Sequence, residues 1–131
     1  MSTRNKRSAD VDHLVTQYEP QTQALITAAR EALLAAFPQA EESADLQAHV
    51  LGYGYGPGYK GIIATLILSK TGVKIGIPYG AALADPEGLL TGAGKVHRHI
   101  AITGAKQLRA PATKAVLKAA LSAWRSRISD T

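Results

Sequence analysis

Residues 61–77 read GIIATLILSKTGVKIGI. Residues 61–69 are apolar at nearly every position, which predicts a central strand that is covered or contacted on both faces. Lys70, Thr71 and Gly72 predict a short hairpin turn, with Gly72 free to adopt a positive φ. Residues 73–77 alternate, which predicts a return strand with its apolar side inward. The pair indicates an antiparallel sheet.

Helices are predicted on both sides of this hairpin. Apolar residues recur with a 3.6-residue period from Pro20 to Phe37, and the last helix begins at Pro111 with a stripe of Leu117, Leu121, Trp124 and Ile128. A shorter amphipathic stretch covers residues 10–18 and begins at Ser8 or Asp10.

The remaining segments complete the predicted fold. Residues 38–43 read as a loop, residues 46–53 and 96–102 as strands, and residues 80–94 are too glycine-rich for a long element. We therefore predict an α+β two-layer sandwich, with an N-terminal helix, an antiparallel sheet of about four to five strands and a C-terminal helix, both helices on one face.

The composition bounds the class of protein. The chain has 131 residues, 46% of them hydrophobic, and no cysteine, which excludes disulfides, cysteine-ligated zinc and a thiol nucleophile. We predict one domain at residues 10–128, preceded by a flexible basic tail at residues 1–9. No apolar run reaches the ~18 residues of a membrane span. No apolar segment follows the basic N-terminus as in a secretory signal, so we expect a cytoplasmic protein.

The net charge of +5 is unevenly distributed. Residues 10–45 contain one base and seven acids, whereas residues 106–131 contain six bases and one acid. A basic chain suggests nucleic-acid binding. The excess at the chain ends is also what a solvated tail and the outer face of a terminal helix produce, and we favour that explanation.

The glycine-rich stretches do not fit nucleotide-binding loops. Residues 52–58 read GYGYGPG, but a dinucleotide fingerprint requires glycine where Pro57 stands. The spacing from Gly88 to Gly94-Lys95 is one residue too long for a P-loop, and Val96 replaces the magnesium-binding hydroxyl. No G-x-S-x-G motif is present. We predict that the chain is not an enzyme and that these glycines serve tight turns and close backbone approach.

Tyrosines offer one further interpretation. Tyr53 and Tyr55, with Tyr59 beside them, could form a platform on which single-stranded nucleic acid stacks near basic residues. The chain has only one Phe and one Trp, so tyrosines must also supply core volume, and nucleic acid is the less favoured partner.

Two sets of residues are candidates for metal binding. His97 and His99 stand two positions apart on a predicted strand and so point to one side. His49 with Asp85 or Glu87 could complete a site, but we favour a half-exposed histidine pair that is hydrogen-bonded to its neighbours, since a firm metal site needs three or four convergent ligands. The acidic Glu41, Glu42 and Asp45 carry the hard oxygen ligands that iron accepts.

Residues 80–95, GAALADPEGLLTGAGK, followed by Arg98, His99 and Ile100, resemble the signature of the YdhG-like domain family. The similarity is specific at residues 73–102. It implies a small α+β sandwich, usually found alone in the bacterial cytoplasm. The family is sometimes described as frataxin-like, and some members are proposed as intracellular iron chaperones. It supplies no catalytic residues. Frataxin-type iron binding uses a ridge of carboxylates on the first long helix, whereas the predicted helix at residues 20–37 contains a single acidic residue, Glu31.

The same block suggests a binding function on physical grounds. Asp85 can cap a turn at Pro86, and Lys95 with Arg98 places two cations beside a glycine loop that can hold a carboxylate or phosphate. An Asp85–Arg98 ion pair without a ligand is the alternative. We therefore expect a non-enzymatic module that binds a small anion, a metal or a protein partner through residues 80–99, using Asp85, Gly92, Gly94, Lys95 and Arg98. Iron delivery and single-stranded nucleic-acid binding are the alternatives.

Overall fold

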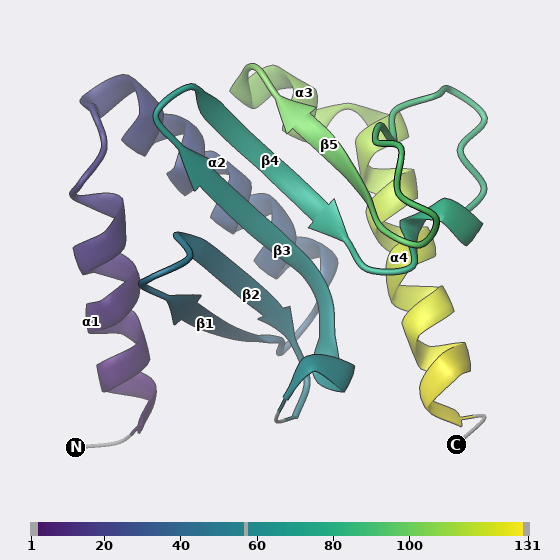
Figure 1. The fold of residues 1–131 in the computed structure, drawn as a ribbon, viewed down its shortest axis with the longest axis horizontal. Helices are drawn as coiled ribbons and strands as arrows, with labels where there is room; N and C mark the ends of the chain where they lie inside the picture. The colour runs from purple at the N-terminus through teal and green to yellow at the C-terminus, as the bar shows by residue number, and fades with distance from the viewer. Residues whose placement is uncertain (1–2, 57, 130–131) are drawn as a thin grey trace.

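The computed structural model describes residues 3–56 and 58–129. Its helices are α1 (Thr3–Val15), α2 (Pro20–Ala36), α3 (Ala105–Arg109) and α4 (Pro111–Ser129). Its strands are β1 (Glu41–Asp45), β2 (Val50–Gly54), β3 (Ile62–Ser69), β4 (Gly72–Ile77) and β5 (Arg98–Ile102), with 3₁₀ turns η1 (Tyr59–Gly61) and η2 (Gly80–Ala82). The strands form one antiparallel sheet in the order β1-β2-β3-β4-β5 (Figure 1). The predicted α+β class is confirmed.

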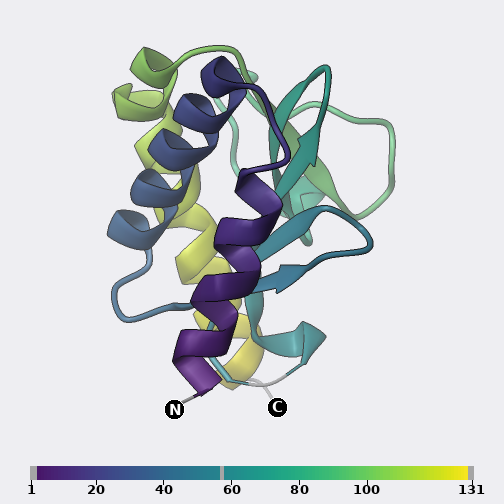
Figure 2. The ribbon, with the colours of Figure 1, turned by 90° about the vertical axis from the view of Figure 1, so that its left-hand side faces the viewer.

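The sheet has one covered face and one open face. Helices α2 and α4 pack on the covered face, and α1 lies beside β1 at the edge of the sheet (Figures 1 and 2). Alternating side chains of β3, β4 and β5, among them Leu66, Ile75 and Ile100, point into this core and are buried with Leu33 of α2 and Leu117 of α4. The intervening side chains form the open face.

Several elements differ from those predicted: residues 46–49 form a turn before β2, β5 begins at Arg98, and α3 was not predicted. Helix α1 begins at Thr3 and so includes residues assigned to a flexible tail. Residues 41–45 form β1, paired with β2, and not the predicted loop. The alternating pattern was hidden because Glu42, whose side chain faces the helices, is charged and pairs with Arg30 of α2. An inward carboxylate breaks the apolar alternation by which a strand is recognised.

The turns also differ in detail. Ser69 pairs directly with Gly72, and Gly72 does not adopt the positive φ we predicted for it. In a different turn, between β1 and β2, His49 has φ 58°, a left-handed conformation that non-glycine residues rarely adopt. The Tyr18 hydroxyl and His49 Nδ1 are hydrogen-bonded, which ties the segment after α1 to this turn.

Candidate functional site

The segment from Leu83 to His97, called here the 83–97 loop, leads from η2 to β5. It projects beyond the sheet on the side opposite the helices (Figure 2). Most of its residues are exposed, as expected for the region predicted to bind a ligand. The loop is nevertheless fixed to the sheet by hydrogen bonds at several points.

Asp85 holds the first half of the loop. Its carboxylate oxygens accept hydrogen bonds from the backbone N–H groups of Leu89 at 2.9 Å and Leu90 at 2.8 Å. Its carbonyl oxygen accepts one from Gly88 N–H at 3.1 Å, and Gly88 has φ 64°. The predicted capping role of Asp85 is confirmed.

Removal of this cap provides a test of the loop's order. We expect Asp85→Ala to lower the free energy of unfolding by about 1 kcal/mol, the usual cost of losing a side-chain cap. Hydrogen exchange followed by NMR should show faster exchange at Leu89 and Leu90, with Glu87→Ala as the exposed control. Unchanged exchange at both amides would show that the carboxylate does not hold the loop.

The second half of the loop is held against β5. Thr91 and His99 exchange two backbone hydrogen bonds, Thr91 N–H to His99 O at 2.8 Å and His99 N–H to Thr91 O at 3.0 Å. The Arg98 guanidinium donates to the carbonyl oxygen of Gly94 and, at 2.9 Å, to that of His97. Arg98 therefore positions the Gly94 region of the loop.

The alternative of an Asp85–Arg98 ion pair is wrong. Within residues 3–56 and 58–129, both side chains bond to backbone groups and not to each other. Because the Arg98 guanidinium already holds two carbonyl oxygens, it offers less to an external anion than its charge suggested. Lys95 is exposed on the same loop.

A cleft of about 440 Å³, called here the Gly76 cleft, lies between the loop and the open face of the sheet. Gly76 makes its floor possible, since a Cβ there would lie 2.5 Å from Thr65 Oγ1 and 3.2 Å from Ile67 Cδ1. The lining is largely apolar and consists of Thr65, Ile67, Gly76, Ile77, Pro78, Gly92, Ala93, Gly94, His97, Arg98 and His99.

Two imidazoles border this cleft. The His97 ring packs edge-on against Tyr79 with 6.3 Å between centroids, and the Tyr79 N–H lies 3.4 Å from His97 Nδ1. The partly buried His99 ring lies beside Gly92, where a Cβ would be 3.4 Å from His99 Nδ1. Within the described residues the His99 imidazole makes no hydrogen bond. It can therefore donate to, or accept from, a bound molecule.

The predicted metal sites do not assemble. In the part of the chain that the structure describes, no group of three or more histidine, aspartate or glutamate side chains could hold a metal ion. His49 is bonded to Tyr18, and Asp85 accepts hydrogen bonds from backbone amides. Among the described residues, neither these two nor Glu87 forms a metal-binding group with His97 and His99.

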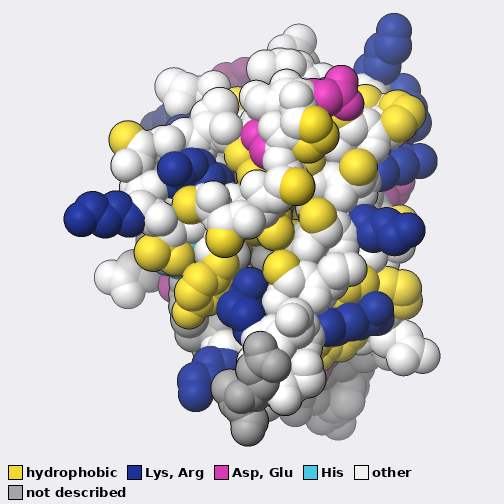
Figure 3. All heavy atoms as spheres, turned by 90° about the vertical axis from the view of Figure 1, so that its right-hand side faces the viewer, with side chains coloured by type: hydrophobic (Ala, Val, Ile, Leu, Met, Phe, Trp, Pro, Cys, Tyr) yellow, Lys and Arg dark blue, Asp and Glu magenta, His cyan; other side chains and the backbone are white. Residues whose placement is uncertain are grey.

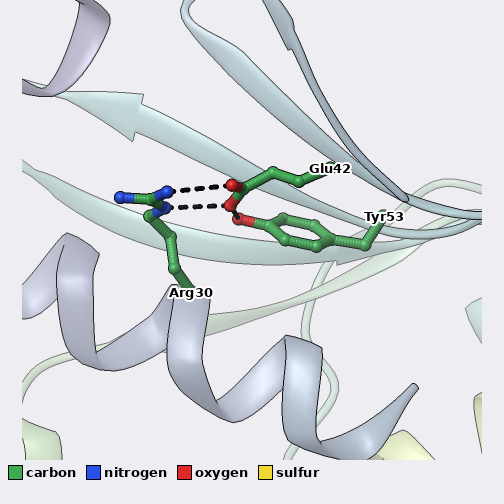
Figure 4. Close-up of polar contacts among 3 residues, drawn as sticks. All are labelled: Arg30, Glu42 and Tyr53. Carbon is green, nitrogen blue, oxygen red and sulfur yellow. Dashed lines mark hydrogen bonds and ion pairs between the residues drawn. The ribbon is translucent and has the colours of Figure 1, made fainter. Parts of the chain in front are cut away.

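The acidic front is divided between the two sides of β1. Glu41 is exposed, whereas Glu42 points inward and forms a two-point ion pair with Arg30, with 2.9 Å from Arg30 Nε to Glu42 Oε2 and 2.9 Å from the second guanidinium nitrogen to Oε1 (Figure 4). Tyr53 donates its hydroxyl proton to Glu42 Oε2 at 2.5 Å. Asp45 accepts from Ala48 N–H at 2.9 Å.

This triad of Arg30, Glu42 and Tyr53 fixes the ionisation of its members. Burial raises the pKa of Glu42, but the hydrogen bonds from Arg30 and Tyr53 outweigh burial and bring the pKa below its ordinary value. The hydrogen bond to Glu42 raises the pKa of Arg30. Burial, with the nearby carboxylate, raises the pKa of the Tyr53 hydroxyl. Glu42 is therefore an ionised structural group.

The predicted tyrosine platform is also wrong. Tyr53 is 0% exposed, and Tyr55 packs against Trp124 with 5.3 Å between ring centroids. The Tyr55 hydroxyl donates to the carbonyl oxygen of Pro38 at 2.6 Å. The Tyr59 side chain lies outside the described residues. Tyr53 and Tyr55 therefore do not form the exposed pair of rings that such a platform requires.

Comparison with known proteins gave no match: no family, no curated protein and no solved structure corresponds to this chain. The resemblance of residues 73–102 to YdhG-like domains stays a prediction. Over the described residues, every helix is too short or too polar to cross a membrane.

The sequence patterns did not identify the floor of the Gly76 cleft. They did identify the residues on its other side, which are Gly92, Gly94, His97, Arg98 and His99. Gly76 carried the available signal, since a glycine inside an alternating strand indicates a bulge or a close approach of other groups. The pattern of residues 61–77 identifies the strands but not which part of the open face the distant loop covers.

Proposed function

We propose that this protein is a non-enzymatic binding module, which holds a small organic acid with a compact apolar body in the Gly76 cleft. The observation that carries this proposal is the His99 imidazole, which is partly buried at an apolar cleft and makes no hydrogen bond within the described residues.

The lining supports this class of ligand. Ile67 and Pro78 supply an apolar surface that favours a hydrocarbon or aromatic body. His99 at the border supplies a hydrogen-bond donor for one carboxylate, and Lys95, exposed on the same loop, adds positive charge to the loop. Arg98 contributes by holding the Gly94 carbonyl and so fixing the wall of the cleft. A fixed wall reduces the entropy lost on binding.

The polar side chains of this lining are His97, His99, Arg98 and Thr65. The residues lining the cleft include no carboxylate and no thiol, and Thr65 provides their only hydroxyl. Thr65 Oγ1 lies close to Gly76 on the floor. Iron delivery and nucleic-acid stacking are less favoured, because Glu42 and Tyr53, on which they depended, are bonded to each other and to Arg30.

The proposal is tested by NMR titration of the ¹⁵N-labelled protein with benzoate and, separately, with neutral benzamide. We expect benzoate to shift the amide signals of Gly76, Gly92 and His99, and to bind at least tenfold more tightly than benzamide. His99→Gln should weaken benzoate binding about tenfold, since one charge-assisted hydrogen bond is worth about 1.5 kcal/mol or more.

His13→Gln, a substitution of an exposed histidine on α1, is the matched control and should leave binding unchanged. Equal binding of benzoate by the wild type and His99→Gln would overturn the role of the imidazole. Absence of any shift around the cleft at millimolar benzoate would overturn the proposed ligand class.

A further inference from the structure

A second hollow lies in the helical layer. It is an open groove of about 710 Å³ between α2 and α4, closed at one end by α3, and is called here the α2–α4 groove. Neither the sequence patterns nor the proposed function account for it.

The α2 wall of the groove is unusually smooth. Ala28, Ala32, Ala35 and Ala36 line it, at positions that share one face of a helix. Their methyl groups allow another backbone to approach closely. The opposite wall presents Leu117 and Leu121 of α4. From Lys114 to Arg125 this wall extends about 16 Å at 1.5 Å per residue, which matches about three turns of a helix.

The charges around the groove are strongly biased. Arg109 of α3 and Lys114, Lys118 and Arg125 of α4 line it, against Glu31 alone from α2. Within residues 3–56 and 58–129, these four cations form no ion pair with a carboxylate. Figure 3 views the side of the molecule where α4 and the 83–97 loop lie, and on that face Lys and Arg side chains outnumber Asp and Glu. The cations are therefore available to an anionic partner.

We propose that the α2–α4 groove binds an acidic amphipathic α-helix of a partner protein. The apolar stripe of that helix lies on the alanine wall, and its carboxylates face the cations of α3 and α4. This is the recognition of a helix in a groove, in which apolar anchors recur every three or four residues, with charge complementarity setting orientation and rate of association.

Other occupants fit less well. An acyl chain in an open groove leaves much of its hydrocarbon in water, whereas a helix brings its own polar face for the solvent side. A second copy of this chain, docked groove to groove, brings the same four cations against their counterparts, and the repulsion between like charges opposes that arrangement.

The test uses a set of fluorescent 18-residue peptides with Leu and Ala at i, i+3, i+4 and i+7 and Glu along the flank. A matched set carries Lys in place of Glu. We expect the acidic peptides to bind the full-length protein, the basic peptides not to bind, and binding to weaken with salt. Lys114→Glu with Lys118→Glu should weaken binding at least tenfold.

A second variant tests the groove without changing charge. Ala35→Trp fills the groove and should also weaken binding at least tenfold, whereas Ala24→Trp, exposed on the same helix outside the groove, should not. Lys70→Glu with Lys74→Glu, on the β3–β4 hairpin, is the charge-matched control. Thermal unfolding of each variant confirms that it is folded.

The proposal is overturned by any of three results. The first is that no acidic peptide binds at low salt. The second is that the hairpin control loses as much affinity as the α4 variant, which would indicate general attraction between charges. The third is that vesicles of phosphatidylglycerol bind through Lys114 and Lys118 while the peptides do not, which would make the ligand a lipid surface.

Discussion

Gly54→Ala should lower the free energy of unfolding by roughly 3 kcal/mol, at the upper end of what overpacking costs. A Cβ at residue 54 would lie 1.8 Å from the carbonyl oxygen and 2.7 Å from the carbonyl carbon of Gly61. These are backbone atoms, which cannot rotate away as a side chain would. The end of β2 and the segment that precedes β3 must separate locally to admit the methyl group.

The damage should reach beyond this contact. Tyr55 N–H donates to the Gly61 carbonyl oxygen at 2.9 Å, and the β2–β3 register shifts between Tyr53 and Gly54. A displaced Gly61 carbonyl therefore weakens the point where β2 and β3 meet. Tyr53, one residue away, is fully buried, so its packing should suffer too.

Urea denaturation followed by circular dichroism measures the effect. Gly72→Ala is the matched control, because a Cβ there meets nothing within 4 Å and the φ of Gly72 is not positive. We expect the control to stay within about 0.5 kcal/mol of the wild type. A Gly54→Ala protein as stable as Gly72→Ala would show that the backbones are not in close contact.

Glu42→Gln should have the second largest effect on stability, a loss of about 2 kcal/mol at neutral pH. The substitution removes a charge-assisted hydrogen-bond pair and leaves the Arg30 guanidinium without its counter-ion. The side chains of Arg30 and Glu42 are 25% and 15% exposed, so water screens the pair only partly. Glu87→Gln, on the exposed loop, is the charge-matched control.

The pH dependence has a defined sign. The pKa of Glu42 is lower in the folded state than its ordinary value, so its stabilisation is fully present above the unfolded-state pKa of about 4.3. It is lost as the pH falls through the folded-state pKa. The difference between wild type and Glu42→Gln should therefore be constant at neutral pH and shrink in acid.

A double-mutant cycle with Arg30→Met separates the ion pair from other effects. We expect the double variant to be less destabilised than the sum of the single variants, since each single change already breaks the pair. Additive free energies of unfolding would contradict the coupling shown in Figure 4.

The elements predicted correctly are those in which burial alone sets the pattern. The helix at residues 20–36 and the hairpin at residues 62–77 bury regular apolar faces, so their periodicity reveals them. Strand β1 was missed because Glu42 is satisfied by Arg30, which lies twelve residues earlier and on another element. The spacing of residues along the sequence does not reveal that a charged side chain will be buried beside an oppositely charged one from another element.

The sequence also located the 83–97 loop correctly, but it did not reveal which groups the charged side chains of the loop contact. Asp85 acts locally on Leu89 and Leu90, and local capping is readable from sequence. Arg98 was expected to meet either an anion or Asp85, yet it holds the carbonyls of Gly94 and His97. A guanidinium bonds to carbonyls and carboxylates alike, so its partner is decided by the path of the loop.

An intermolecular NOE experiment on the benzoate-saturated protein locates the ligand directly. If a small acid binds in the Gly76 cleft, the aromatic protons of benzoate should give NOEs to the methyl groups of Ile67 and Thr65, and these NOEs should be weaker in the His99→Gln protein at the same ligand concentration. NOEs to the methyl groups of Ala28 and Ala32 without any to Ile67 would place the ligand in the helical layer and contradict the assignment of the binding site.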